Sequence, residues 1–147
     1  MDDMTKHPKR KDRPGVDRYG RTELHYAAFE GDVGKIKALL SGGMNAGASD
    51  DDGLTPLHAA VKSGSLPSCA ALLKADAPVD ARDANGNTPL STAVFESRGR
   101  GDIIRLLREH GADPTIKNNY GVSPLGLARS IANFDVRRFF ADLPASE

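Results

Sequence analysis

The sequence has no Trp, a single Cys and no net charge, and each of these features narrows what the chain can be. Only 5% of its 147 residues are aromatic, so its core has to be built mainly from Leu, Ile, Val and Ala side chains. The one cysteine, Cys69, excludes an internal disulfide and a cysteine-based metal site, and it fits a reducing compartment. Because the 20 basic and 20 acidic residues cancel, no overall electric field attracts nucleic acid or an anionic membrane.

The sequence also lacks any apolar run that could cross a membrane or serve as a secretory signal, and we therefore expect a cytoplasmic protein. Residues 1–16 are polar and charged and contain two prolines, which predicts a disordered basic leader. Its Lys9-Arg10-Lys11 cluster has two interpretations, an ordinary solvated segment or a nuclear address that also contacts polyanions, and the acidic residues nearby favour the first. Residues 144–147 are predicted to be a short polar tail.

What the sequence does contain is one motif that recurs at nearly constant spacing. Its fullest copy runs from Gly53 through Thr55-Pro56-Leu57-His58, and the counterparts of Gly53 follow one another at steps of 33, 33 and 35 residues. The Thr55 hydroxyl can cap free backbone N–H groups and Pro56 suits the first turn, so a helix is predicted to begin here. A second apolar segment at helical spacing follows each motif and predicts a second helix. The four copies span residues 17–49, 50–82, 83–117 and 118–143.

The 33-residue period, the Thr-Pro-Leu-His motif and the stop at Gly111-Ala112-Asp113 resemble ankyrin repeats. The resemblance covers residues 17–143 and implies an all-α repeat fold, an ankyrin solenoid of four helix-turn-helix repeats with hairpin-like loops that project to one side. The fourth copy is the least regular: Gly126 replaces the motif histidine and Arg137 replaces an apolar residue, as expected of a terminal cap.

The same resemblance implies a non-enzymatic module that binds another protein through its concave face and loops, without a cofactor and as a monomer when free. Small stand-alone bacterial ankyrin proteins look similar, and some of these resemble immunity proteins that neutralise a toxin. Four repeats leave no room for an output domain, so binding would itself have to change what the partner does. This suggests a stoichiometric inhibitor. The alternatives are a scaffold or adaptor protein and, less favoured, nucleic-acid contact through the leader.

Candidate partner-binding residues are those that depart from the repeat pattern at hairpin tips, just after the motif glycines, and at the ends of the first helices. In ankyrin proteins these positions line the concave face, and aromatic residues with Arg are typical of interface hot spots. The competing interpretation is that Phe29 and Phe95 fill a groove in the stack and that the tip tyrosines lie flat on neighbouring hairpins. The predicted set is Arg18, Tyr19, Arg21, Phe29, Glu30, Asp51, Asp52, Leu54, Lys62, Asn85, Asn87, Phe95, Glu96 and Tyr120, with Arg98 and Arg100 on the enlarged turn of the third copy.

That enlarged turn, Arg98-Gly99-Arg100-Gly101, has two interpretations, a grip for an acidic or phosphate group or a tolerated surface insertion, of which the second is favoured. No histidine stands with cysteine or carboxylate at metal-ligand spacing, and the glycines form no phosphate cradle, so no catalytic, cofactor or metal residue is predicted. His25 and His58 occupy the same motif position, where the ring can link its own repeat to the next by hydrogen bonds. Cys69 follows Ile36 by 33 residues, which predicts a core position.

Overall fold

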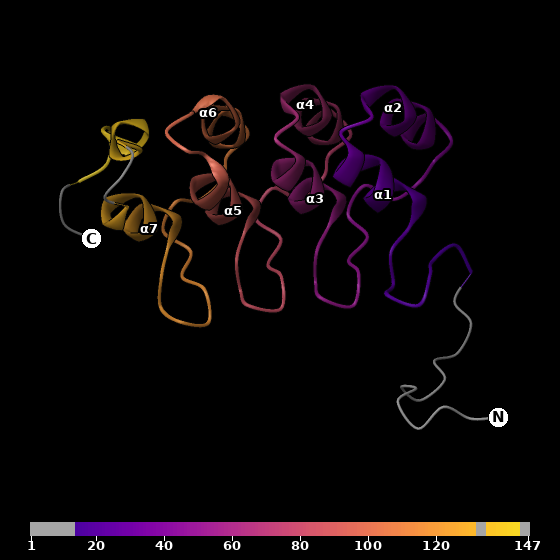
Figure 1. Cartoon of the computed structure of the whole chain (residues 1–147), viewed down its shortest axis with the longest axis horizontal. Coiled ribbons are helices and arrows are strands. Elements are labelled where there is room, and N and C mark those ends of the chain that lie inside the picture. The colour runs from indigo at the N-terminus through magenta and orange to yellow at the C-terminus, as the bar shows by residue number, and fades with distance from the viewer. Residues whose placement is uncertain (1–13, 132–134, 145–147) are drawn as a thin grey trace.

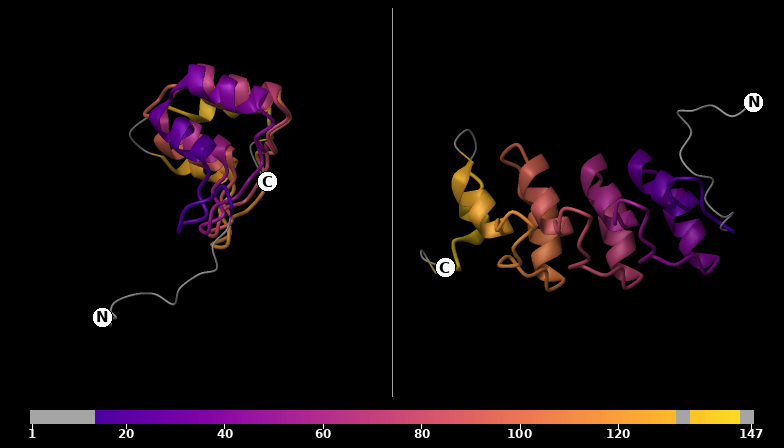
Figure 2. Two further views of the ribbon diagram at one scale, coloured as in Figure 1. Left: turned by 90° about the vertical axis from the view of Figure 1, so that its right-hand side faces the viewer. Right: turned by 90° about the horizontal axis from the view of Figure 1, so that it is seen from below.

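The computed structural model describes residues 14–131 and 135–144, so the predicted leader lies almost wholly outside the described part. The described residues form seven α-helices and one 3-10 helix, with no strand among them. Figure 1 shows two layers of helices, and Figure 2 shows, end-on, the hairpin loops that descend from one of these layers. The first helices of the repeats are α1 (Glu23–Glu30), α3 (Pro56–Ser63), α5 (Pro89–Glu96) and α7 (Pro124–Ser130), and the second are α2 (Val33–Ser41), α4 (Leu66–Lys74), α6 (Asp102–Glu109) and η1 (Arg137–Phe140). The predicted all-α repeat fold is confirmed.

Each first helix begins where the motif predicts. The hydroxyl of Thr22, Thr55, Thr88 or Ser123 accepts the backbone N–H three residues further on, which caps one of the free donors of the first turn. In α1 and α3 a histidine at that third position reaches back to the N–H of the capping threonine and completes a reciprocal capping box.

The two motif histidines also join neighbouring repeats, as predicted. His25 Nε2 lies 2.8 Å from the carbonyl oxygen of Leu54, and His58 Nε2 lies 3.0 Å from that of Asn87. Each ring therefore fixes the spacing between its own helix and the next hairpin. The third and fourth copies have Ser91 and Gly126 at this position and lack the link.

The hairpins hold one another in a row. Asp51 N–H donates to the Tyr19 carbonyl oxygen at 2.9 Å, and equivalent bonds join the second hairpin to the third and the third to the fourth, at 2.8 and 2.9 Å. The close approach requires glycine: Gly53 has a φ of +76°, and a Cβ on it would lie 2.9 Å from the backbone nitrogen of Ala84. The hairpin tips therefore form a continuous hydrogen-bonded edge along the array.

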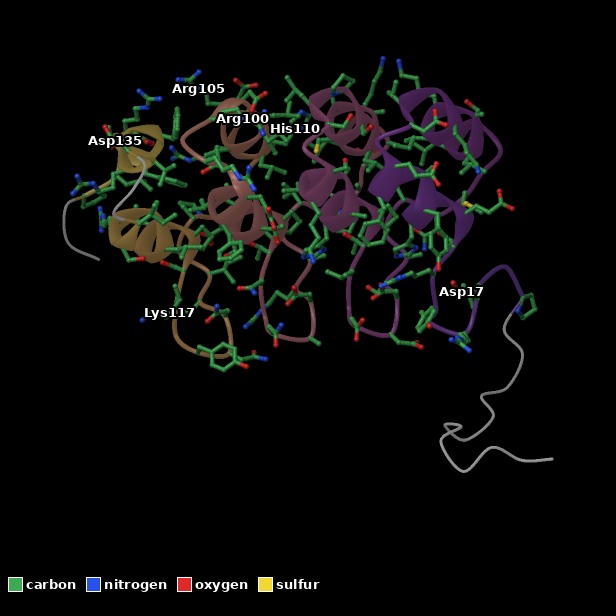
Figure 3. All side chains as sticks on the ribbon, viewed as in Figure 1. Asp17, Arg100, Arg105, His110, Lys117 and Asp135 are labelled. Atoms are coloured by element: carbon green, nitrogen blue, oxygen red, sulfur yellow. The ribbon has the colours of Figure 1, made fainter. Side chains whose placement is uncertain are left out.

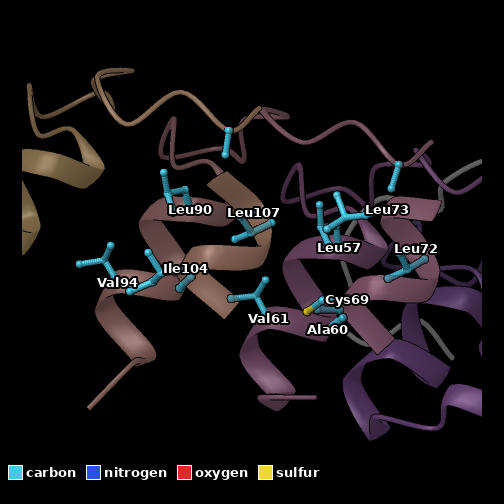
Figure 4. Packing of buried hydrophobic residues seen from close by; sticks show 14 of the residues in the cluster. Leu57, Ala60, Val61, Cys69, Leu72, Leu73, Leu90, Val94, Ile104 and Leu107 are labelled. Atoms are coloured by element: carbon cyan, nitrogen blue, oxygen red, sulfur yellow. The ribbon is translucent and has the colours of Figure 1, made fainter. Parts of the chain in front are cut away.

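The core lies between the two helix layers and runs through all four repeats. The first helices contribute Leu24, Leu57, Leu90 and Leu125, one from each motif, all buried. Cys69 is fully buried in this cluster, so its predicted core position is confirmed (Figure 4). Helix α4 packs against α2 on one side and α6 on the other, which places repeat 2 in the interior of the stack.

The fourth repeat caps the array with less helix than the sequence predicts. Among the described residues its second element is a single 3-10 turn, Arg137–Phe140, without a side-chain cap, and a segment this short does not propagate an α-helix on its own. Val136, Phe139 and Phe140 are nevertheless buried as expected. Arg108, which stands where the first two copies have a leucine, donates to the Phe139 carbonyl oxygen at 2.9 Å and to both carboxylate oxygens of Asp142 at 2.7 and 2.8 Å.

Candidate functional site

The hairpins and the first helices share one face of the array, which we call the inner face. Most of the predicted partner-binding residues lie on it, on the tips or at the exposed ends of α1, α3 and α5. Its largest exposed side chains are aromatic, and they fall into two groups, one at repeat 1 and one between repeats 3 and 4. The two groups differ in what covers the rings.

At repeat 1 an arginine of the same repeat lies over each ring, although Tyr19 and Tyr26 remain 46% and 37% exposed. The Arg21 guanidinium carbon lies 5.3 Å from the ring centre of Tyr19, 5.2 Å from that of Phe29 and 6.0 Å from that of Tyr26. Arg21 Nε also donates to Asp50 Oδ2 of the next repeat at 3.2 Å. Phe29 is half-buried and packs against the core, which favours the interpretation that this ring fills the stack.

Two further pairs of side chains lie on the surface of repeat 1. Arg18 Nη2 donates to the Tyr19 hydroxyl at 2.8 Å, and its guanidinium lies 5.0 Å from that ring centre. The Tyr26 hydroxyl donates to Asp17 Oδ2, and this hydrogen bond lowers the pKa of the Asp17 carboxyl group. The aromatic and charged side chains at the hairpin of repeat 1 thus mainly contact one another.

Between repeats 3 and 4 the inner face is hollowed into a groove of about 440 Å³, which we call the repeat 3–4 groove. Its two aromatic rings are the most exposed of the described large apolar residues, Phe95 at 72% and Tyr120 at 76%. Six of the predicted residues meet here: Lys62, Asn85, Asn87, Phe95, Glu96 and Tyr120. Six more that sequence reasoning left out of the predicted set complete the lining: Asp83, Ser91, Thr92, Asn118, Val122 and Leu127.

Two of those additional residues build the groove. Asp83 Oδ1 accepts the backbone N–H groups of Asn85 and Asn87, at 2.9 and 3.0 Å, and closes the third hairpin. Asn118 Oδ1 does the same for Tyr120 and Val122, at 2.9 and 3.0 Å, and its amide donates to Asn87 Oδ1 at 2.9 Å. A sequence signal for them exists, because an Asp or Asn stands three residues before each motif glycine, where its side chain can bond to backbone two residues on.

Leu54 corrects the predicted set. The sequence predicts that Leu54 is exposed, like Arg21 and Asn87 at the same motif position. The structure leaves only 9% of it exposed. Its N–H donates to Asp50 Oδ1 of its own hairpin at 2.9 Å, and its carbonyl oxygen accepts from His25 of repeat 1, so these bonds fix its backbone between the two repeats. Arg21, at the same motif position, is only half-buried.

The enlarged turn of repeat 3 lies among the helices, away from the hairpins, as the position of Arg100 in Figure 3 shows. Arg98 and Arg100 line a smaller hollow of about 210 Å³ together with Lys62, Glu96 and Asp102. The turn also contacts the terminal cap: Arg138 Nη2 donates to the Gly99 carbonyl oxygen at 3.3 Å, and the Phe139 ring occupies the space where a Cβ of Gly101 would stand. The enlarged turn is therefore an exposed loop that also packs against the fourth repeat.

Metal binding and thiol chemistry depend on the His, Cys, Asp and Glu side chains of the described residues. No group of three or more His, Cys, Asp or Glu side chains within residues 14–131 and 135–144 could hold a metal ion. Burial raises the pKa of the Cys69 thiol to about 12, so its nucleophilic thiolate is not formed near neutral pH. None of the described helices has both the length and the apolar character of a membrane span.

Comparisons with known proteins agree with this architecture. A family model of ankyrin repeats, in three copies, matches residues 24–118, which run from α1 to the tip of the fourth hairpin. No curated protein matches the chain. The chain therefore belongs to the ankyrin-repeat family.

Proposed function

We propose that this chain binds one protein partner on its inner face, with the repeat 3–4 groove at the centre of the contact. Ankyrin repeats are general, non-enzymatic modules of protein–protein interaction. The observation that carries the proposal is the exposure of Phe95 and Tyr120 on the rim of one groove. Exposed aromatic side chains beside a concave, partly polar lining are typical of interface hot spots.

The groove is suited to tight binding because its walls are already fixed. Hydrogen bonds from backbone N–H groups to Asp83 Oδ1 and Asn118 Oδ1 close both hairpins, and the Asn119 N–H joins the fourth hairpin to the Asn85 carbonyl oxygen at 2.9 Å. Little conformational freedom of the backbone is then lost when a partner binds, and less of the contact energy is spent on ordering loops.

The effect of binding is proposed to be stoichiometric inhibition in the cytoplasm, for example of a toxin by an immunity protein. Its support is the resemblance to small stand-alone bacterial ankyrin proteins. A scaffold or adaptor role would use the same groove, and the two differ in what happens to the partner. An inhibitor abolishes the partner's own activity at one equivalent, whereas an adaptor leaves that activity intact.

Affinity capture with matched variants tests the proposal. The double variant Phe95→Ala/Tyr120→Ala should bind the captured partner at least about thirtyfold more weakly, because truncating buried aromatic anchors commonly costs 2 kcal/mol or more. Tyr19→Ala is the control, because that ring is already covered by Arg18 and Arg21. Unchanged affinity in the double variant, or an equal loss in Tyr19→Ala, would contradict the assignment of the groove.

A further inference from the structure

Arginine covers five of the seven aromatic rings in residues 14–131 and 135–144, and the two uncovered rings are those of the repeat 3–4 groove. Arg21 lies over Tyr19, Tyr26 and Phe29. In the terminal cap, Arg105 and Arg138 lie 5.0 and 4.9 Å from the ring centre of Phe139, and Arg108 lies 5.3 Å from that of Phe140. Phe95 and Tyr120 have no such neighbour among the described residues and are the most exposed rings.

The repeat register shows what is missing at the groove. Phe95 follows Phe29 by 66 residues and occupies the same position in repeat 3 that Phe29 occupies in repeat 1. Asn87 follows Arg21 by the same 66 residues, so a short amide stands where the covering guanidinium stands in repeat 1. The groove thus has the aromatic wall of repeat 1 without its arginine.

The charges of the groove suit a cation. Its lining contains the carboxylates of Asp83 and Glu96 and one ammonium group, Lys62, which leaves a net negative charge. Asp83 Oδ1 is used by the hairpin, whereas its Oδ2 and both carboxylate oxygens of Glu96 make no hydrogen bond or ion pair with any described residue. In repeat 1 the corresponding arginine likewise combines ring stacking with a carboxylate, that of Asp50.

We infer that the repeat 3–4 groove receives an arginine side chain of the partner, stacked on Phe95 and Tyr120 and paired with Asp83 and Glu96. The inference rests on the proposed function of the inner face. A guanidinium fits better than an ammonium, because its planar group stacks on aromatic rings, is more weakly hydrated and bonds carboxylates through two N–H groups at once.

Small probes test the chemistry directly. Amide shifts of the isotope-labelled full chain are followed by NMR during titration with N-acetyl-arginine amide, and with the lysine and citrulline analogues as controls. We expect arginine to shift residues 83–87, 95–96 and 118–122 and to bind at least about threefold more tightly than either analogue. Equal binding of arginine and citrulline, or shifts spread away from these residues, would overturn the inference.

Three variants distinguish the contribution of the Phe95 ring to arginine binding from that of the two carboxylates. Phe95→Leu keeps an apolar side chain but removes the aromatic face, and Glu96→Gln removes one charge. Asp83→Asn removes the other while keeping the hairpin, since Asn118 makes the same two backbone bonds in repeat 4. Each should reduce the preference for arginine over citrulline, whereas Glu109→Gln on α6, which is outside the groove lining, should not. A preference that survives all three groove variants would sink the idea.

Peptide selection distinguishes this inference from the proposed function. Random peptides are selected on the immobilised chain and tested against the Phe95→Ala/Tyr120→Ala variant. Selected peptides that need both rings, contain arginine and lose at least about tenfold in affinity when it becomes citrulline support both proposals. Peptides that need both rings but contain no arginine overturn the arginine inference alone. Peptides indifferent to both rings overturn the arginine inference and the assignment of the groove together.

Discussion

His58 uses both nitrogens of its ring to join two repeats. Its Nδ1 accepts the backbone N–H of Thr55 at 3.2 Å, so the ring proton stands on Nε2, which donates to the Asn87 carbonyl oxygen at 3.0 Å. A second proton on Nδ1 would point at the Thr55 N–H and break the cap of α3. Burial also lowers the pKa of His58 below its ordinary value of 6.5. The neutral imidazole is therefore the form that the fold requires.

Stability should depend on pH through this ring. As the pH falls below about 6.5 the unfolded chain protonates His58 before the folded chain does, because the pKa of the folded imidazole is lower, so the unfolded state binds more protons. The free energy of unfolding is therefore expected to be fully maintained above about pH 6.5 and to fall as the pH drops below it. Urea denaturation at a series of pH values measures this dependence.

His58→Gln is the matched control, because glutamine at the same position can complete the capping box without titrating. The variant should be less stable at pH 7, since the link to Asn87 is lost, and its stability should depend less on pH. The same slope in both proteins would assign the pH dependence to other groups.

Two glycine substitutions should have opposite signs. Gly34→Ala in α2 meets only ordinary contact with Asp32 and should raise the free energy of unfolding by about 0.5 kcal/mol, because alanine restricts the unfolded chain. Gly101→Ala would overlap the Phe139 ring and should lower the free energy by about 1–3 kcal/mol. Thermal unfolding of both variants compares them. An unchanged midpoint for Gly101→Ala would show that the enlarged turn does not seat the terminal cap.

The thiol of Cys69 should report unfolding of the inner repeats. It is fully buried, so a disulfide reagent cannot reach it in the folded protein. Its pKa is raised to about 12, so at about pH 8 it is not a reactive thiolate. Labelling should be slow in buffer and rapid in denaturing urea. Rapid labelling of the native protein would place Cys69 in a segment that opens without global unfolding.

The fold could be predicted from the sequence because its determinants are local and recur. Thr55 and Pro56 define a helix start by their own chemistry, and the 33-residue spacing repeats that start along the chain. The shortened second element of repeat 4 was not predicted, because the spacing of Val136, Phe139 and Phe140 also fits an α-helix. The burial of Leu54 was not predicted, because it depends on a contact with the preceding repeat. The seat of Phe139 against Gly101 joins residues 38 positions apart, which no local pattern records.

The candidate site could be predicted only in part. Phe29 and Phe95 are the same residue type at the same motif position, yet one is half-buried under Arg21 and the other is exposed. Motif position predicts that both lie on one face, but whether a ring is covered depends on a residue of the hairpin before it, which is Arg21 in repeat 1 and Asn87 in repeat 3. The groove depends on Asp83 and Asn118 in the same way, since their role is to hold the backbone that presents Tyr120.

Leu72 tests the register of the whole array. It is fully buried in α4, in a repeat with neighbours on both sides, so truncation leaves a cavity that the surrounding helices cannot fill. Leu72→Ala is expected to lower the free energy of unfolding by about 2–5 kcal/mol in urea denaturation. Phe95→Ala removes a larger side chain, but one already exposed to water, and should cost less than about 0.5 kcal/mol. If the two variants lost the same stability, Phe95 would be part of the packed core, and the groove could not use its ring to bind a partner.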